Sequence, residues 1–164
     1  MPPRSPRGWK NKIMTKTNER SRARSAARLA AAQALYQQEM EGTPLARLLD
    51  EFHQHRLGAT IEDVQYAVAE VSFFDDLVTG VDARREEVDA AITARLAPGW
   101  SLDRLDRPMR QILRVGAYEL LARPDVPTAT VISEYVDVAD AFYEKREKGF
   151  VNGVLDGIAK AVRV

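Results

Sequence analysis

The stretch Phe150–Val164, FVNGVLDGIAKAVRV, decides the fold. Its apolar residues recur at helical spacing and form one stripe: Val151, Val154, Leu155, Ile158, Ala159 and Val162. A second row at four-residue spacing consists of Gly149, Gly153 and Gly157. Because glycine inside a helix costs about 1 kcal/mol relative to alanine, we expect another backbone to approach this row closely. The stretch is therefore predicted to be a C-terminal helix with one face in the core.

The same helical period continues through the rest of the chain. Small residues between Ala23 and Leu35 predict a central helix over about 19–40. Apolar stripes predict further helices over about 45–56, over 61–96 with a break near Ser72 and a bend near Gly80, after Asp106, and over 128–142, where Phe142 is expected in the core. No useful stretch alternates with the period of a strand. The sequence therefore predicts an all-α bundle of about six to seven helices.

Composition limits the class of protein. The chain has 164 residues, 45% of them hydrophobic, enough for one domain with a core. We expect residues 1–18, with three prolines and no helical period, to be a disordered basic extension and residues 19–164 to form a single domain. Met14 is an alternative start that would remove four of the cations. Cysteine is absent, which suits a reducing cytoplasm, and neither a membrane-spanning run nor a secretory signal is found.

Charge is distributed unevenly along the chain, although its formal net value is zero. Residues 1–28 contain nine Lys or Arg and one acid, whereas residues 29–164 contain fifteen Lys or Arg and twenty-three acids. A basic arm on an acidic body is typical of a nucleic-acid-binding protein whose contact is confined to one face. A solubilising tail is the alternative that charge alone leaves open.

Arginines follow one flank of the predicted first helix. Arg20, Arg24 and Arg28 lie four residues apart, and Arg22 lies elsewhere on the helix. Like charges at this spacing repel by a few tenths of a kcal/mol per pair, and an anionic partner would relieve that repulsion. A solvated charged edge is the plainer alternative.

No catalytic or metal-binding pattern emerges. His53 and His55 are two residues apart, so on a helix they point about 200° apart and cannot share a metal. Asp75 and Asp76 are adjacent and diverge in the same way, which makes them a poor acid–base pair. Glycine-rich phosphate or dinucleotide loops are missing. We therefore expect no enzyme activity, no metal and no cofactor.

Several sequence blocks occur together in one order. They are QALY at 33–36, ILR at 112–114, YEL at 118–120 and FVNGVLD at 150–156. In this combination the chain resembles the NusB family of bacterial transcription antitermination factors over about residues 20–163. The resemblance implies two small helical subdomains packed together, here about 19–82 and 83–164.

The resemblance also implies partners. Family members bind the boxA element, a single-stranded RNA sequence in ribosomal RNA leader transcripts, together with NusE, a small-subunit ribosomal protein. The pair joins an RNA polymerase antitermination complex. Some members self-associate through the surface that partners would use, so a homodimer is left open. A membrane partner is not expected.

The resemblance places RNA contacts at the start of the first helix and around the FVN segment. The corresponding candidates are Arg20, Arg22, Arg24, Arg28, Gln33, Lys148, Phe150 and Asn152. Cations would neutralise phosphates, Phe150 would stack on a base and Asn152 would contact a base edge. Core packing is an equal alternative for Phe150, and support of a buried polar group is an alternative for Gln33.

Candidates for the protein-partner surface are Tyr36, Phe74, Tyr118 and Glu119. For Tyr36 and Glu119, buried hydrogen bonds are an equal alternative. Two positions depart from the family pattern: Ser133 stands where asparagine is common, and Gly149 stands where a basic residue is common, which shifts the cationic contact to Lys148.

Two rival functions belong to other classes. The first is an accessory domain like those that precede the catalytic domain of some ribosomal RNA cytosine methyltransferases. The second is a helical adaptor that binds only proteins. RNA binding through phosphates should weaken steeply with salt, and a protein contact should respond less.

Overall fold

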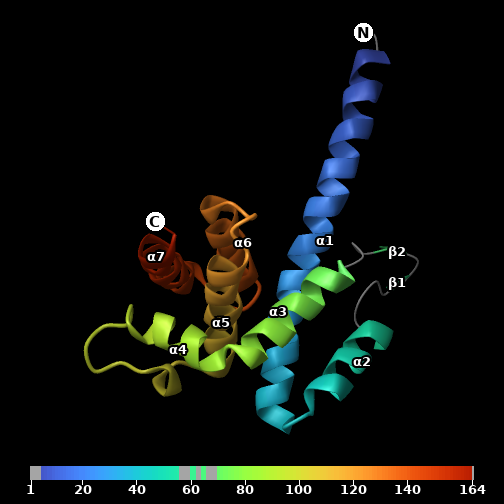
Figure 1. Cartoon of the computed structure of the whole chain (residues 1–164). Coiled ribbons are helices and arrows are strands. Elements are labelled where there is room, and N and C mark those ends of the chain that lie inside the picture. The colour runs from blue at the N-terminus through green and yellow to red at the C-terminus, as the bar shows by residue number, and fades with distance from the viewer. Residues whose placement is uncertain (1–4, 56–59, 62–63, 66–69, 164) are drawn as a thin grey trace.

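Seven α-helices pack together in the part of the chain that the structure describes (Figure 1). The structure is a computed structural model; it describes residues 5–55, 60–61, 64–65 and 70–163, with side chains for 19–55 and 70–163. The helices are α1 (Ser5–Glu41), α2 (Leu45–His55), α3 (Val71–Ala83), α4 (Arg85–Thr93), α5 (Arg107–Ala122), α6 (Thr128–Asp140) and α7 (Lys145–Val162). One 3-10 turn, Leu102–Arg104, precedes α5. The all-α fold predicted from the helical period is confirmed.

The central helix is α1, because its small side chains allow four other helices to approach it. Ala27, Ala31 and Ala34 are fully buried, and α1 packs against α2, α3, α5 and α6. Its N-terminal end extends past the other helices (Figure 1). Since α1 contacts helices on both sides of the predicted subdomain boundary, the two halves share one core; the boundary itself stays a prediction.

In the C-terminal half, α5 is the buried centre. Nearly every residue from Met109 to Leu120 is buried, because α5 packs against α1, α3, α4, α6 and α7. Gly116 permits this packing, because a side chain there would lie 3.0 Å from Leu155 of α7. The predicted apolar stripe of α7 faces this core from Val151 to Ala159, whereas Val162 is exposed.

The start of α1 differs from the sequence-based prediction. The helix begins at Ser5 rather than near Glu19, so residues 5–18 are helical where a disordered extension was expected. Pro6 lies in the first turn, where its missing N–H breaks no helical hydrogen bond, and the next proline is Pro44. Residues 1–4 lie outside the described residues.

The helix predicted over 61–96 is wrong at its start. Thr60–Ile61 (β1) and Val64–Gln65 (β2) pair as antiparallel strands, in keeping with the β-branched residues they contain. Helix α3 begins only at Val71 and continues through Gly80 to Ala83, and α4 begins after a break at Arg84. Glycine at position 80 is required by packing, because the ring of Tyr118 fills the space of a side chain.

The glycine row of α7 does not make the close contacts that its spacing predicts. A side chain added at Gly149 or Gly153 would meet no atom within 4 Å, and one at Gly157 would meet only the Arg95 side chain. The row therefore faces outward at its first two positions. The close approaches occur instead at Gly80 and Gly116.

Substituting these glycines should separate the two environments. We expect Gly153→Ala to raise the free energy of unfolding by about 0.5–1 kcal/mol, because alanine restricts the unfolded chain and has space in the helix. We expect Gly80→Ala to lower it by about 1–3 kcal/mol, because the Tyr118 ring must move. Urea unfolding of both variants measures the difference. A loss of stability in Gly153→Ala would mean that this face of α7 is packed.

Candidate nucleic-acid interface

The exposed arginines among the predicted RNA contacts lie in the N-terminal half of α1. Arg20 and Arg22 are exposed, and neither pairs with any side chain within 19–55 or 70–163. Arg24 is less available, because its Nε donates to Glu70 at 3.1 Å and its guanidinium lies 4.8 Å from the centre of the Phe73 ring. Two cations without a partner among the described side chains, and one engaged cation, therefore lie on this part of α1.

Arg28 is a correction to the predicted RNA contacts, because it is buried in the core with 1% of its surface exposed. Its Nε and Nη2 donate to the two carboxylate oxygens of Glu119 at 2.9 and 2.8 Å. The Tyr135 hydroxyl donates to Glu119 at 2.7 Å, and the Glu134 carboxylate lies 3.4 Å from Arg28 Nη1. Burial lowers the pKa of Arg28, but the hydrogen bond to Glu119 and the negative charge of Glu119 raise that pKa more. The net shift of the pKa is therefore upward.

Removing Arg28 should therefore destabilise the fold. Arg28→Ala leaves the Glu119 carboxylate buried without its ion pair, and breaking such a pair costs about 3–5 kcal/mol. Guanidinium chloride unfolding should show that loss. The matched control is Arg20→Ala on the exposed part of the same helix, which should change stability by less than about 0.5 kcal/mol. Equal stability of both variants would contradict a structural role for Arg28.

Three of the four residues predicted for the protein-partner surface are also buried. Phe74 is fully buried and stacks on Phe52, with ring centres 5.6 Å apart. Glu119 belongs to the pair with Arg28, so the alternative of buried hydrogen bonds holds for it. Tyr118 packs into the space beside Gly80, and its hydroxyl donates to Asp76 at 2.7 Å. Helical period alone places such residues on a face, and the packing of α3 against α5 makes that face internal.

The environment of Tyr118 should be visible at high pH. Burial, and then the hydrogen bond to Asp76, raise the pKa of Tyr118 to about 12, against about 10 in the unfolded chain. The neutral phenol is favoured in the fold, so its stabilising contribution is complete below pH 10 and is lost as pH rises toward 12. Chemical unfolding at pH 9 to 12 should show a steeper loss of stability in the parent chain than in Tyr118→Phe. Parallel pH profiles would contradict the shift.

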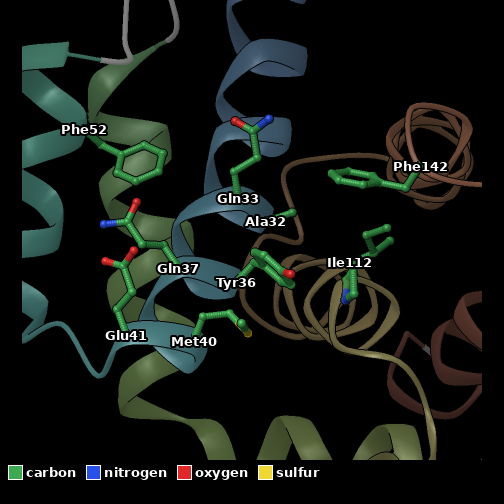
Figure 2. Close-up of a pocket in the computed structure, with 10 residues that line it drawn as sticks. Ala32, Gln33, Tyr36, Gln37, Met40, Glu41, Phe52, Ile112 and Phe142 are labelled. Atoms are coloured by element: carbon green, nitrogen blue, oxygen red, sulfur yellow. The ribbon is translucent and has the colours of Figure 1, made fainter.

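Tyr36 remains exposed and shares a groove with Gln33. This α1 groove, of about 530 Å³, lies between α1 and the helices that face it. Figure 2 shows Gln33 and Tyr36 on α1, with Phe142 facing them from the far wall. Tyr36 is 38% exposed and Gln33 is exposed, so neither supports a buried polar group. The residue predicted for RNA and the residue predicted for a protein partner therefore lie on one surface.

The candidates at the start of α7 are all at the surface. Asn152 is exposed, and Phe150 is 37% exposed, so the core alternative for Phe150 does not hold. Lys148 is half-buried and its ammonium contacts Asp140 at 2.9 Å. Phe150 and Trp100 both line a second groove, the Trp100 groove.

Sequence reasoning missed three aromatic residues of these grooves: Trp100, Phe142 and Tyr143. Phe142 was expected in the core, but α6 ends at Asp140, so Phe142 lies beyond the helix and is exposed. Trp100 directly follows the Pro98–Gly99 turn. A tryptophan just after a turn was the sequence feature that could have indicated a surface position. Tyr143 is held by its hydroxyl, which donates to Asp106 at 2.8 Å.

Fold and surface together define an all-α protein with exposed arginines in the N-terminal half of its first helix and two grooves lined by aromatic residues. No helix among the described residues is long and apolar enough to cross a membrane. The chain belongs to the NusB family: the model of that family matches residues 25–160.

Curated relatives of the family match almost end to end. The chain is 66% identical over 146 residues to a transcription antitermination protein NusB of Sphingopyxis alaskensis, covering 89% of this chain and 98% of that protein. It is 70% identical over 142 residues to the NusB protein of Novosphingobium aromaticivorans, covering 87% and 96%. These proteins carry the name of an antitermination factor.

Solved structures agree in fold. T. maritima NusB is 31% identical with a TM-score of 0.69, covering 84% of this chain and 90% of that one. A complex described as antitermination factors NusB and NusE with double-stranded RNA contains a chain 28% identical, with a TM-score of 0.70, covering 85% and 98%. That complex shows those two proteins together with RNA.

Proposed function

We propose that this protein is an antitermination factor that binds boxA-type single-stranded RNA of ribosomal RNA leader transcripts together with NusE. In this proposal the pair joins an RNA polymerase antitermination complex in the cytoplasm. The observation that carries the proposal is the pair of exposed arginines, Arg20 and Arg22, in the N-terminal half of α1 of a NusB-family chain; neither pairs with a side chain within 19–55 or 70–163.

The surface chemistry supports RNA as the ligand. Arg20 and Arg22 are exposed cations with no acidic partner among the described side chains, and exposed cations are what a phosphate-binding surface requires. On α7, Asn152 offers an exposed amide that can both donate and accept hydrogen bonds to base edges. The related complex of NusB, NusE and RNA supports both partners. The α1 groove, with Tyr36 and Phe142 exposed, is the part of this surface proposed for NusE.

The rival assignments are less well supported. The relatives that cover this chain almost fully are named antitermination proteins rather than methyltransferases. A protein-only adaptor would leave the exposed arginines of α1 without a role. Homodimer formation competes with this proposal only if it occludes the same surface.

RNA binding should depend on Arg20 and Arg22 of α1 and on the salt concentration. We expect the double variant Arg20→Glu with Arg22→Glu to weaken binding of a boxA RNA at least tenfold and to flatten the salt slope by about 1.4, from about 0.7 per phosphate contact. Fluorescence anisotropy at several salt concentrations, with and without NusE, measures both quantities. The matched control reverses two exposed cations elsewhere, Arg47 of α2 and Lys160 near the end of α7.

Two results would overturn the proposal. The first is equal affinity for boxA and scrambled RNA, with no sharpening by NusE, which would reduce the ligand to any polyanion. The second is unchanged affinity in the Arg20 and Arg22 variant, which would place the RNA site elsewhere. Equal losses in the variant and in the control would show a general charge effect.

A further inference from the structure

Glu70, at the start of α3, places a carboxylate beside the arginines of α1. It immediately precedes Val71, the first residue of α3. Its backbone N–H donates to the carbonyl oxygen of Ala23 at 3.0 Å, which ties the start of α3 to α1. The proposed function gives Glu70 no role, although it is anchored next to the surface that would bind RNA.

The side chain of Glu70 is committed to Arg24. It makes no capping hydrogen bond to α3; instead its Oε2 accepts from Arg24 Nε at 3.1 Å. The guanidinium of Arg24 also lies 4.8 Å from the centre of the Phe73 ring. Arg24 is thus held at two points, whereas Arg20 and Arg22 have no partner among the described side chains.

Two further acids on this surface are engaged by Arg123, whose guanidinium lies 5.0 Å from the centre of the same phenylalanine ring. Arg123 donates from Nε and Nη2 to Asp125 at 3.1 and 3.0 Å. It donates from Nη1 to Asp76 at 3.1 Å. Among the described side chains, Glu70 is therefore the acid that neutralises Arg24.

The two partners of the pair can separate, because they lie at the surface. The side chains of Arg24 and Glu70 are 22% and 31% exposed, and partly exposed ion pairs contribute little to stability. Separation leaves both charges in contact with water. The buried pair of Arg28 and Glu119 cannot separate in this way, because each charge would be left without water or a partner.

We propose that Glu70 restrains RNA binding by holding Arg24 in an internal ion pair. The carboxylate and an RNA phosphate compete for one guanidinium, and the carboxylate is already in place. Arg24 is then a latent phosphate contact, which forms only when Glu70 is removed or displaced. The inference rests on the proposed function and deepens it, because it names the residue that limits the affinity of the α1 surface.

Orientation of Arg24 toward RNA is the opposite role that a carboxylate could have here. The guanidinium does not depend on Glu70 for support, because the Phe73 ring lies against it. A fixed negative charge close to a bound phosphate would also oppose binding. Both considerations favour restraint over orientation.

Neutralising Glu70 should strengthen RNA binding. We expect Glu70→Gln to raise the affinity for a boxA RNA about 3- to 10-fold, because Arg24 gains a charge-assisted hydrogen bond to a phosphate. The salt slope should steepen by about 0.7, the value of one phosphate contact on a single strand. Fluorescence anisotropy of a labelled RNA at several salt concentrations measures both quantities. Glu70→Ala should change them in the same direction.

A double-mutant cycle shows whether the gain passes through Arg24. In an Arg24→Ala background, Glu70→Gln removes the same charge but frees no guanidinium. It should then raise the affinity less than about twofold, in a buffer that screens charges more than about 8 Å apart, and should leave the salt slope unchanged.

The matched control is Glu87→Gln, because Glu87 of α4 forms a surface pair of the same kind with Arg84, at 2.8 Å. Its loss should leave RNA binding as in the parent chain. Urea unfolding and far-UV circular dichroism confirm that each variant folds.

The outcomes separate this inference from the proposed function. Equal gains with and without Arg24 would reflect charge alone, and unchanged affinity would place Arg24 out of reach of RNA; either result overturns the inference and leaves the proposed function standing. Weaker binding by Glu70→Gln and Glu70→Ala would overturn it too, because Glu70 would then orient Arg24. If neither the parent nor any variant binds RNA, both proposals fail together.

Discussion

The ion pair between Arg28 and Glu119 is the constraint on which the arrangement of the helices depends. It joins α1 to α5 inside the core, and Tyr135 and Glu134 extend it to α6. A buried charge without its partner costs several kcal/mol. Rotation or sliding of α1 would separate Arg28 from Glu119 and would therefore be strongly unfavourable. The rotation of α1 in turn determines what faces outward. Gln33 and Tyr36 lie three residues apart and share one face, and that face forms the wall of the α1 groove.

Much of the fold follows from the sequence, because helices that bury one face must carry a 3.6-residue period. The stripe of α7 from Val151 to Ala159 and the alanines of α1 lie in the core as that period predicts. The failures occur where period is a poor signal. Over 60–65 the pattern suggested a helix, and a strand pair forms instead. At Gly80 the sequence shows a glycine but not the Tyr118 ring that requires it.

The candidate site was less predictable, because sequence spacing gives the helix face on which a side chain lies but not whether that side chain is buried. Arg20 and Arg28 lie on one flank of α1, yet at 1.5 Å per residue they are about 12 Å apart along its axis. Over that distance the helix passes from solvent into the bundle, so one cation is exposed and the other is buried. Tyr36 and Tyr118 differ because Tyr36 is exposed on α1, whereas Tyr118 lies on α5 and packs against Gly80 of α3. The Trp100 groove was not anticipated, because the residues that line it come from segments that are distant in sequence.

The outward glycines of α7 affect how that helix moves. Gly149 and Gly153 contribute no packing, and each weakens the helix by up to about 1 kcal/mol relative to alanine. Both lie in the first half of α7, around Phe150 and Asn152, whereas the second half contains one glycine, Gly157. Local opening should therefore begin at the N-terminal half, where amide protons exchange sooner than at Ile158 or Ala159. The surface that presents Phe150 and Asn152 is thus the most deformable part of α7, and it can adjust its backbone to a ligand while the C-terminal half stays anchored in the core.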